Sequence, residues 1–530
     1  MVRLGKDAVT IGRHPDNTVP LADDLASRFH CAVEPNGVGG FSVRDLGSRN
    51  GTKVNDQRVK ESALKAGDVL RVGGHEFVIV EDMESDRAGL VESSDDHEVA
   101  EEEETDPAWS AQLIEVIEGL PPKDQPVESL TIIEAGGKAS AALSGSSDGP
   151  AAVRLLLQTA SKARATDIHV EPKSEQYHVR LRVDGQMVAI ASLPGRVGEL
   201  VYGLIKTACQ MRGASRDAVQ EGHFSARFTD RRVEYRVSFT PSVYGQKLVM
   251  RVLDDRSLPR SVGELGMAGY MSDRVKRVCT QDHGLLLVAG PTGSGKTTTL
   301  YTAMREIDRE ARNVVTIEDP VEYQLSNVTQ IPIDDSKGNT FGTLLRSVLR
   351  QDPDVILVGE IRDEETARTA MQAAMTGHLV FSTVHAKDTI AAVFRLLDLK
   401  VEPYLVANAL DLVLGQRLVR VLCDHCKRPV PVSPGQATRL GRFLGGKHEM
   451  FTATGCARCL KTGYRGRRAL YELLDFNDDL RDVVMHDPTI AAMKKVIEQG
   501  LFTTLAQFGW KLVAEGVTTL DEVDKVAGQG

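Results

Sequence analysis

Residues 290–297 read Gly-Pro-Thr-Gly-Ser-Gly-Lys-Thr, which fits the spacing G-x-x-x-x-G-K-[ST] of a phosphate-binding loop. The apolar run Leu285–Ala289 precedes it and the helix-prone run TTTLYTAMREI follows it, as the motif requires. Glycines let backbone N–H groups surround phosphate oxygens, and the helix N-terminus adds positive potential. We expect Lys296 to reach the β- and γ-phosphates of ATP and Thr297 to hold Mg²⁺. The predicted phosphate-binding set is Gly290, Pro291, Thr292, Gly293, Ser294, Gly295, Lys296, Thr297 and Thr298.

A nucleotide site also needs a carboxylate that positions or activates water, and two glutamates qualify. Glu360 follows the apolar run Val355–Val358, and Glu318 ends the strand-like part of VTIEDP. Ligands of open α/β sheets bind at the carboxyl ends of the strands, where both side chains would lie. Either glutamate could instead be a solvated strand end. Strand order and the spacing from the phosphate loop favour Glu360.

Four cysteines form two pairs, Cys423-x-x-Cys426 and Cys456-x-x-Cys459. Two such knuckles supply the four thiolates of a tetrahedral structural Zn²⁺ site. The sequence between them has few large apolar residues, so a metal would replace a missing core. Redox-active disulfides are the alternative. The other three cysteines, Cys31, Cys209 and Cys279, stand alone, and we expect buried thiols.

Length and composition place the motifs in a multidomain chain. At 530 residues the chain predicts about three or four domains of roughly 150 residues each. No apolar run approaches the roughly 18 residues of a membrane span, and the first residues lack a signal-peptide core, so we expect a cytoplasmic protein. Residues 81–106 hold thirteen acidic residues against one arginine, Arg87, which more than accounts for the net charge of −10. That composition is typical of a disordered linker.

Residue patterns divide the chain into five parts. Alternating runs broken by turn signals predict a β-sandwich over 1–80, and an acidic and Gly/Ser-rich linker follows over 81–150. A helix and then alternating strands predict an α+β domain over 151–260. Alternating β-like and helical runs predict a parallel α/β sheet over 263–475, with the four-cysteine insertion at 417–466 and C-terminal helices over 476–530.

Five ordered blocks resemble the ATPases of type II secretion and type IV pilus assembly. They are GPTGSGKTTTLY, VTIEDPVEY, LRSVLRQDPDVILVGEIRD, TGHLVFSTVHAKDT and LGQRLVRVLCDHC, and DIHVEP and RLRVDG agree upstream. The resemblance implies a RecA-like P-loop domain that hydrolyses ATP. It also implies a catalytic role for Glu360 and places Glu318 in the family's aspartate box. His385, after His378, falls in the histidine box that senses the γ-phosphate.

The same resemblance assigns arginines. Arg236 and Arg251 match positions that clamp the phosphates when the preceding domain closes, and Arg346 and Arg350, expected on one helix face, match arginines that reach a neighbouring subunit's nucleotide. The chain departs from the family at His223. The family commonly has a Q-D-G-R run here, and His223 stands where that run ends in arginine.

The family resemblance also indicates how the protein is assembled and where it works. It implies a homohexamer working with inner-membrane platform and docking proteins, peripheral to that membrane, with no direct nucleic-acid partner. It supports Zn²⁺ at Cys423, Cys426, Cys456 and Cys459, and it favours pilus extension or secretion over retraction.

The N-terminal part resembles a forkhead-associated (FHA) domain, a reader of phosphothreonine. The blocks that carry the resemblance are Gly12-Arg13, Ser27-Arg28-Phe29-His30 and DLGSRNGT at 45–52. The resemblance implies that Arg13 and Ser27 contact the phosphate and Asn50 the peptide backbone. Arg28 and Arg49 add positive potential nearby. We therefore expect a motor that is docked or regulated through a phosphothreonine-containing protein. A phospho-regulated scaffold, in which nucleotide binding is only a switch, is the alternative.

Overall fold

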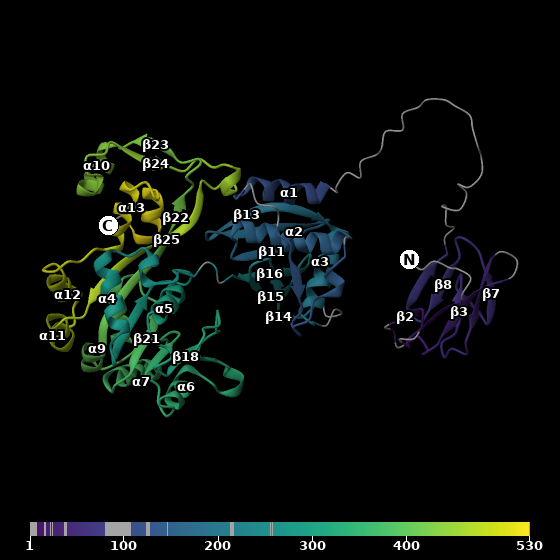
Figure 1. Ribbon diagram of the computed structural model, residues 1–530, viewed down its shortest axis with the longest axis horizontal. Helices are drawn as coiled ribbons and strands as arrows, with labels where there is room; N and C mark the ends of the chain where they lie inside the picture. Colours follow the sequence, from purple (N-terminus) through teal and green to yellow (C-terminus); the bar gives the residue numbers. More distant parts are fainter. Residues whose placement is uncertain are drawn as a thin grey trace. The chain divides into compact units, whose positions relative to one another are not determined.

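The computed structural model describes residues 8–79, apart from 15–16, 22, 24 and 37–39, and residues 108–528, apart from 123–127, 146, 212–216, 255 and 257. The chain forms two compact units, Met1–Glu102 and Glu103–Gly530 (Figure 1). The predicted acidic linker over 81–106 lies outside the described residues. Within the described ranges, no helix is long and apolar enough to cross a bilayer.

The first unit is a sandwich of short β-strands, as its alternating runs predict. One sheet has the order β2-β1-β3-β4-β7 and the other β6-β5-β8-β9. Alternate side chains face inward, and Val33, Val43, Leu70 and Val72 are buried between the sheets. The strands are β1 Val9–Gly12, β2 Val19–Pro20, β3 Cys31–Pro35, β4 Phe41–Asp45, β5 Thr52–Val54, β6 Gln57–Val59, β7 Glu61–Leu64, β8 Val69–Val72 and β9 His75–Val78.

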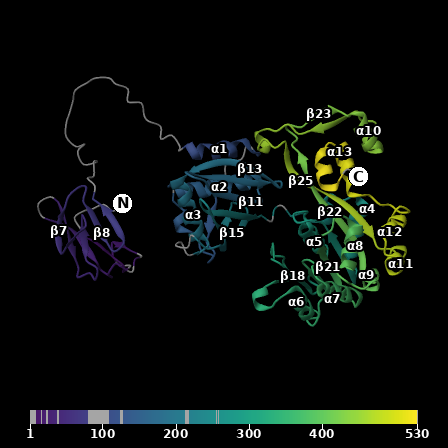
Figure 2. The same cartoon turned by 180° about the vertical axis from the view of Figure 1, so that it is seen from behind.

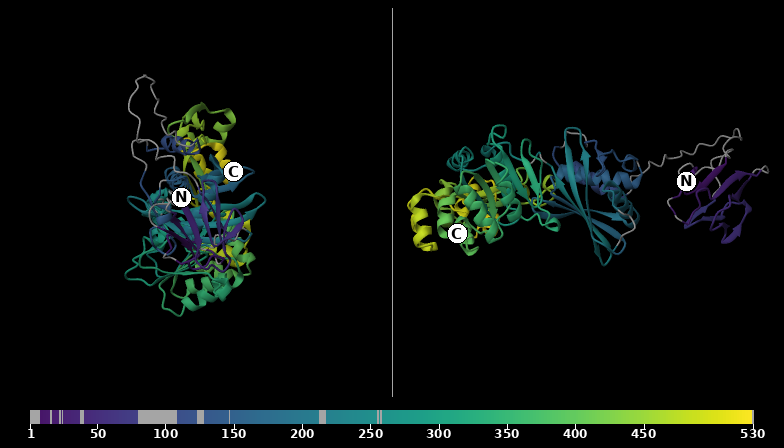
Figure 3. Two further views of the ribbon diagram at one scale, coloured as in Figure 1. Left: turned by 90° about the vertical axis from the view of Figure 1, so that its right-hand side faces the viewer. Right: turned by 90° about the horizontal axis from the view of Figure 1, so that it is seen from below.

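The second unit begins with the predicted α+β domain. Its sheet has the order β10-β14-β15-β16-β11-β12-β13, and helices pack on one face, where Tyr235 and Val179 are buried (Figure 3). The helices are α1 Ala108–Gly119, η1 Ala141–Leu143, α2 Asp148–Ala163 and α3 Gly195–Ala208. The strands are β10 Thr131–Ile133, β11 Asp167–Pro172, β12 Gln176–Val183, β13 Gln186–Pro194, β14 Gln220–Arg227, β15 Arg232–Ser242 and β16 Gly245–Leu253.

The predicted linker over 81–150 is wrong in its second half. Helix α1 and strand β10 belong to the α+β domain: β10 pairs with β14, and Trp109, Leu113 and Ile132 are buried in the domain's core. The Pro-, Ser- and Gly-rich sequence around these elements masked them. The apolar side chains of α1 find their core only against elements that follow much later in the chain.

The P-loop domain is a seven-stranded sheet of order β19-β18-β20-β21-β17-β22-β25, parallel except for β25. Leu286 and Val288 of β17 face one core, and Leu285 and Leu287 face another, so the strand is buried on both sides. The strands are β17 Gly284–Ala289, β18 Val314–Glu318, β19 Thr329–Pro332, β20 Val355–Val358, β21 Leu379–Val384, β22 Leu410–Leu422 and β25 Tyr464–Asp475.

Helices cover both faces of this sheet (Figures 1 and 2). One core includes side chains of α4, α5, α13 and α14, and the other includes side chains of α6 to α9, α11 and α12. Figure 2 shows the same arrangement from behind. The helices are η3 Val262–Leu265, α4 Gly269–Cys279, α5 Lys296–Met304, η4 Asp335–Lys337, α6 Phe341–Val348, α7 Glu364–Met375, α8 Thr389–Asp398, α9 Pro403–Ala409, α11 Asp478–His486, α12 Ile490–Ile497, α13 Leu505–Ala514 and α14 Leu520–Ala527.

The cysteine-bearing insertion is shorter than the predicted 417–466. Strand β22 continues to Leu422 and β25 begins at Tyr464, and these two residues are register partners. The insertion therefore spans 423–463. The residues on either side of it belong to two core strands, and this is evident only from the pairing of those strands. It contains β23 Arg428–Pro431, α10 Pro434–Leu440, η5 Gly441–Leu444, β24 Glu449–Thr452 and η6 Ala457–Cys459.

Candidate functional site

The predicted phosphate loop connects the buried strand β17 to helix α5. Gly293 and Gly295 have positive φ angles of 77° and 84°, which favour glycine. At Gly290 a Cβ atom would lie 2.4 Å from the Ser294 hydroxyl and 2.7 Å from the Gln416 carbonyl, so no side chain fits. Helix α5 begins at Lys296, and its free N–H groups therefore face the loop.

The side chains of the loop fit a phosphate ligand. Lys296 Nζ donates to the carbonyls of Gly290 at 2.9 Å and Pro291 at 3.1 Å, so the ammonium group lies over the loop. Burial lowers the pKa of Lys296, and the nearby Glu360 carboxylate opposes that shift. The buried Ser294 hydroxyl has no hydrogen-bond partner among the described residues. Pro291, Thr292, Gly293 and Thr297 are exposed, and Thr298 is half-buried.

Glu360 lies just beyond the carboxyl end of β20, with its backbone fixed by neighbouring strands. The Gly359 N–H donates to the Ile317 carbonyl at 2.8 Å, and the Thr383 hydroxyl donates to the Gly359 carbonyl at 2.8 Å. A Cβ on Gly359 would lie 3.1 Å from the Ile317 oxygen, so a side chain at this position would be crowded.

The Glu360 carboxylate has two cationic or potentially cationic neighbours. His385 Nε2, which follows β21, lies 3.2 Å from Glu360 Oε2. Arg362 pairs with the other carboxylate oxygen, and this hydrogen bond raises the pKa of Arg362. Since β20, β21 and β17 are adjacent in the sheet, Glu360, His385 and the phosphate loop meet at one edge.

Glu318 lies at the same edge but is enclosed by its own domain. It is 3% exposed and accepts hydrogen bonds from Tyr301, from Thr316 at 2.5 Å and from Gln330 at 3.1 Å. Burial and the bond to Glu318 raise the pKa of Tyr301. These contacts give Glu318 a bracing position, whereas Glu360 faces the lysine of the loop.

The two arginines of the α+β domain are register partners. Arg236 on β15 lies opposite Arg251 on β16, and His223 on β14 lies on the other side of Arg236. The Arg236 guanidinium donates to the Val321 carbonyl and lies 3.5 Å from Glu322, both in the P-loop domain. Arg251 lies 3.5 Å from Asp167. Three groups that bear or can bear positive charge therefore form one row across this sheet.

Arg346 and Arg350 do not share one helix. Helix α6 ends at Val348, so Arg350 belongs to the following turn, contrary to the expectation of a common helix face. Arg346 pairs with Glu365 of α7, and Arg350 NH1 donates to the Arg346 carbonyl at 3.0 Å. Both side chains are exposed. Their groups are thus available on the surface beside α6 and α7.

Three residues that the sequence analysis did not single out belong to this region. Arg362 holds Glu360, and Gln416 and Arg417 lie against the phosphate loop and the segment after His385. The signal was present for Gln416 and Arg417: these adjacent polar residues lie in the middle of the mainly apolar run LVLGQRLVRVL. Such residues need hydrogen-bond partners in the interior.

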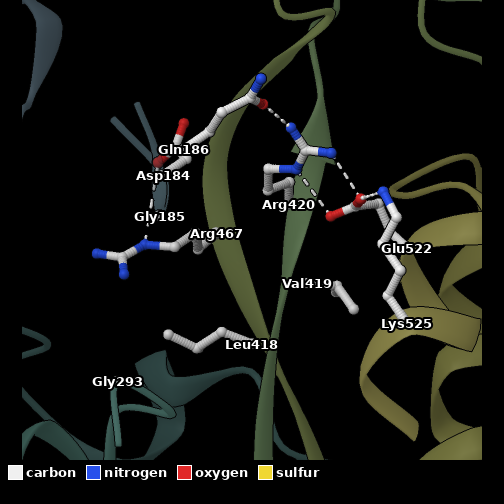
Figure 4. A pocket seen from close by; sticks show the side chains of 10 residues that line it. All are labelled: Asp184, Gly185, Gln186, Gly293, Leu418, Val419, Arg420, Arg467, Glu522 and Lys525. Atoms are coloured by element: carbon white, nitrogen blue, oxygen red, sulfur yellow. Dashed lines mark hydrogen bonds and ion pairs between the residues drawn. The ribbon is translucent and has the colours of Figure 1, made fainter. Parts of the chain in front are cut away.

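Two cavities adjoin the phosphate loop. One, of about 490 Å³, lies beside Gly293, where the β12–β13 turn meets the P-loop domain (Figure 4). Asp184 accepts from the Gly466 N–H at 2.6 Å, and Arg420 bridges Gln186 and Glu522. The other, of about 810 Å³, is lined by Gly295, Thr298, Thr299, Tyr323, Gln416 and Tyr471, among others. Its volume lies in the range of small-molecule sites.

The four cysteines of the insertion converge. All four sulfur atoms lie within 4.8 Å of one another, and the distances for Cys423–Cys456, Cys426–Cys459 and Cys456–Cys459 are 3.9, 3.8 and 3.7 Å. Sulfurs placed about 2.3 Å from a tetrahedral zinc ion lie roughly 3.8 Å apart. The donor set and its spacing therefore fit Zn²⁺. Cys31, Cys209 and Cys279 are buried free thiols, as expected.

In the first unit, three loops bring the predicted phosphopeptide residues together. The Arg13 N–H donates to the Ser27 carbonyl at 2.9 Å, and the Arg49 N–H donates to Ser27 Oγ at 2.9 Å. Asn50 Nδ2 donates to the Leu25 carbonyl at 2.7 Å. The side chains of Arg13, Arg28, Arg49 and Asn50 are exposed, so the site is an open surface.

Two polar side chains hold these loops in place. His30 is fully buried, and its Nδ1 accepts from the Ser27 N–H at 3.0 Å. Asp45 accepts from the Ser48 and Thr52 hydroxyls at 2.5 and 2.6 Å. Burial alone would raise the pKa of Asp45, but these bonds outweigh it and lower the pKa to about 2. A Cβ on Gly12 would lie 2.6 Å from the Arg28 carbonyl, which requires glycine before Arg13.

Comparisons with known proteins agree with the two units. Residues 147–525 match the family described as type II/IV secretion system protein, and residues 9–73 match the FHA domain. Type II secretion system protein E of Pectobacterium carotovorum is 40% identical over 374 residues, which are 71% of this chain and 74% of that protein. The type IV pilus assembly ATPase PilB of Myxococcus xanthus is 38% identical over 380 residues, 70% and 66% of the two chains.

Solved structures agree on the fold. The ATPase DotB of Legionella pneumophila superposes with a TM-score of 0.56 at 20% identity, over 72% of this chain and 96% of that one. The chain therefore belongs to the type II/IV secretion system protein family, as an ATPase with an N-terminal FHA domain.

Proposed function

We propose that this chain hydrolyses ATP to drive conformational work in type IV pilus assembly or in type II-like protein secretion. One observation carries the proposal: the phosphate loop, Glu360 and His385 meet at one sheet edge, with His385 Nε2 3.2 Å from the Glu360 carboxylate. The cavity of about 810 Å³ beside Thr298 has room for the nucleoside.

In this proposal each residue has a separate task. Lys296 leaves the loop carbonyls and neutralises the β- and γ-phosphates, and Glu360 orients and deprotonates the attacking water. His385, whose Nε2 lies beside the Glu360 carboxylate, senses the γ-phosphate. Thr297 would hold the Mg²⁺ that accompanies ATP, and this ion would neutralise phosphate charge. Arg236 and Arg251 clamp the phosphates when the α+β domain closes on the P-loop domain.

The test separates binding from chemistry. Lys296→Ala is expected to lose nucleotide binding and turnover, because the main phosphate charge partner is gone. Glu360→Gln is expected to bind ATP and hold it, with turnover lowered by at least about a hundredfold. Steady-state hydrolysis and binding of a fluorescent nucleotide measure both. Glu360→Gln that turns over ATP as fast as an active wild type contradicts the assignment of Glu360. A wild-type turnover no higher than that of Lys296→Ala favours a nucleotide switch instead.

The proposed working form is a homohexamer at the cytoplasmic face of the inner membrane. Support comes from the arginines: Arg346 and Arg350 are exposed beside α6 and α7, where they are available to a neighbouring subunit. An arginine supplied across a boundary stabilises charge on the transferred phosphoryl group. Platform and docking proteins of a pilus or secretion machine are the proposed partners, with no direct nucleic-acid contact.

The FHA domain is the proposed docking or regulatory module. Arg13, Ser27 and Asn50 come from three loops that hydrogen bonds tie together, an arrangement suited to one phosphothreonine peptide. Arg28 and Arg49 add positive charge at the rim. Binding of a phosphorylated partner would recruit the ATPase to its site of action.

The insertion is proposed to hold one structural Zn²⁺ at Cys423, Cys426, Cys456 and Cys459. Purified protein is then expected to contain about one zinc per chain, and the double variant Cys423→Ser/Cys426→Ser none. Elemental analysis measures the metal, and hydrogen exchange of residues 423–463 reports whether the insertion loosens. The double variant Cys209→Ser/Cys279→Ser is the control and is expected to keep its zinc. Metal-free protein with paired cysteines as disulfides contradicts this proposal.

A further inference from the structure

The middle of β22 carries an adjacent polar pair, Gln416 and Arg417, in a strand that is otherwise apolar there. Their exposures are 2% and 9%, and β22 lies between β17 and β25. Burying an amide and a guanidinium costs free energy unless their polar atoms find partners. Their partners are the segments that form the nucleotide site.

Gln416 binds the phosphate loop through its side-chain amide. Its Nε2 donates to the Ser294 carbonyl at 2.7 Å, and its Oε1 accepts from the Thr299 hydroxyl at 2.8 Å. The Ser294 carbonyl can only accept a hydrogen bond, so the amide nitrogen must face it, which fixes the orientation. The amide therefore joins the end of the loop to the first turn of α5.

Two glycines of the loop lie close against the same residue. A Cβ on Gly290 would lie 2.7 Å from the Gln416 carbonyl oxygen, and a Cβ on Gly295 would lie 2.8 Å from Gln416 Nε2. The backbone of the loop thus packs directly against Gln416. A displacement of Gln416 would therefore remove contacts that hold the N–H groups of the loop in place.

Arg417 holds the segment after His385. Its NH2 group donates to the carbonyls of Lys387 at 2.5 Å and Ala386 at 3.3 Å, and its NH1 group donates to the Gln416 carbonyl at 2.8 Å. The planar guanidinium thereby ties the histidine segment to β22. A lysine ammonium cannot reproduce this fork.

We propose that Gln416 and Arg417 are positioning residues for ATP hydrolysis: Gln416 sets the shape of the phosphate loop, and Arg417 sets the segment that presents His385 to Glu360. The inference rests on the proposed ATPase function. It assigns different consequences to two neighbouring residues, since one supports the binding loop and the other supports the catalytic pair.

Gln416→Leu tests the first half. It keeps most of the volume but leaves the Ser294 carbonyl without its donor, and the dissociation constant for ATP, measured with a fluorescent analogue, is expected to rise about tenfold or more. Thr299→Val is a milder second variant that removes only the other hydrogen bond and is expected to raise it about threefold. Because both act on one contact, the double variant should fall short of the product of the two effects.

Arg417→Lys tests the second half. The positive charge remains, so the dissociation constant is expected to change less than about threefold, whereas kcat is expected to fall about tenfold. Gln246→Leu is the matched control for Gln416→Leu. Like Gln416, Gln246 is a buried amide, 6% exposed, but it lies on β16 of the α+β domain. This variant is expected to lower the melting temperature and leave both nucleotide affinity and kcat near wild type.

The outcomes are distinguishable. Wild-type affinity in folded Gln416→Leu and Thr299→Val overturns the role of Gln416, and unchanged kcat in Arg417→Lys overturns that of Arg417. If Gln246→Leu loses affinity and kcat as much as Gln416→Leu and Arg417→Lys do at an equal drop in melting temperature, the inference is also overturned. A wild-type protein that binds no ATP overturns the proposed function together with it.

Discussion

The chain contains two sites suited to phosphate groups, and they are built in opposite ways. In the FHA domain, Arg13, Arg28, Arg49 and Asn50 are exposed on loops, and hydrogen bonds to Ser27 and Leu25 hold those loops in place. In the P-loop domain, the loop follows the fully buried β17 and packs on the buried Gln416. The first site is an open surface suited to a peptide. The second is an internal edge suited to enclosing a nucleotide.

The two sites also differ in how many of their expected residues lie together. The FHA residues that would contact phosphate already lie together in one small unit. The nucleotide site has its loop, Glu360 and His385 in place, but Arg346 and Arg350 are turned to the surface beside α6 and α7. In the proposed hexamer, Arg346 and Arg350 would complete the nucleotide site of a neighbouring subunit.

The largest expected effect tests this incompleteness. Arg346→Ala and Arg350→Ala are each expected to lower turnover by up to about a thousandfold, as for other arginines supplied in trans, and to change ATP affinity little. Mixing either variant with Lys296→Ala subunits is expected to restore part of the activity. Arg368→Ala, which breaks the ion pairs of an arginine on α7 with Glu364 and Glu402, is the control with near-normal turnover. The absence of rescue at every ratio, in rings shown to be mixed, would place the arginines in their own subunit's site or outside catalysis.

A second prediction tests whether the two sites are independent. Arg13→Ala is expected to weaken binding of a phosphothreonine peptide by about a hundredfold, because a charge-assisted contact to the phosphate is lost. Arg44→Ala removes an exposed pair with Glu34 in the same domain and is expected to bind normally. Peptide titration followed by fluorescence anisotropy measures both. Equal affinity for phosphorylated and unphosphorylated peptide would indicate that this FHA domain binds its partner without phosphate.

The smallest expected effect concerns the carboxylate that braces the FHA loops. The pKa of Asp45 is about 2 in the folded chain, below its ordinary value near 4, so its stabilisation is full above about pH 4 and is lost as the pH falls toward 2. Asp45→Asn is expected to cost on the order of 1–2 kcal/mol at pH 7 and to remove this acid dependence. Hydrogen exchange of β5 and β8, corrected for intrinsic rates, measures the stability of these strands at each pH.

The exposed Asp56 gives the control for this prediction, since Asp56→Asn in the same domain should change little. An unchanged acid dependence in Asp45→Asn would show that another group controls the stability of the FHA loops below pH 4.

Much of the architecture was predictable because it depends on local pattern. The strands before Gly290 and Glu360 are unbroken apolar runs, and the turn residues of DLGSRNGT lie between short alternating strands. The second half of the predicted linker was wrong for a related reason. The local sequence around Trp109 is rich in linker-like residues, and only the distant β13 and α2 give this helix a surface to pack on.

The sequence by itself determined the phosphate loop, the candidate catalytic Glu360, the cysteine knuckles and the FHA blocks, because in each case the spacing of a few residues carries the chemistry. The tertiary structure alone decided which polar residues meet. Glu318 is closed off by Tyr301 and Gln330, and Gln416 binds Ser294 from 122 positions away. The physical reason is sheet order: β17 lies between β21 and β22, and the partners of a buried polar side chain follow from that order rather than from neighbours in the sequence.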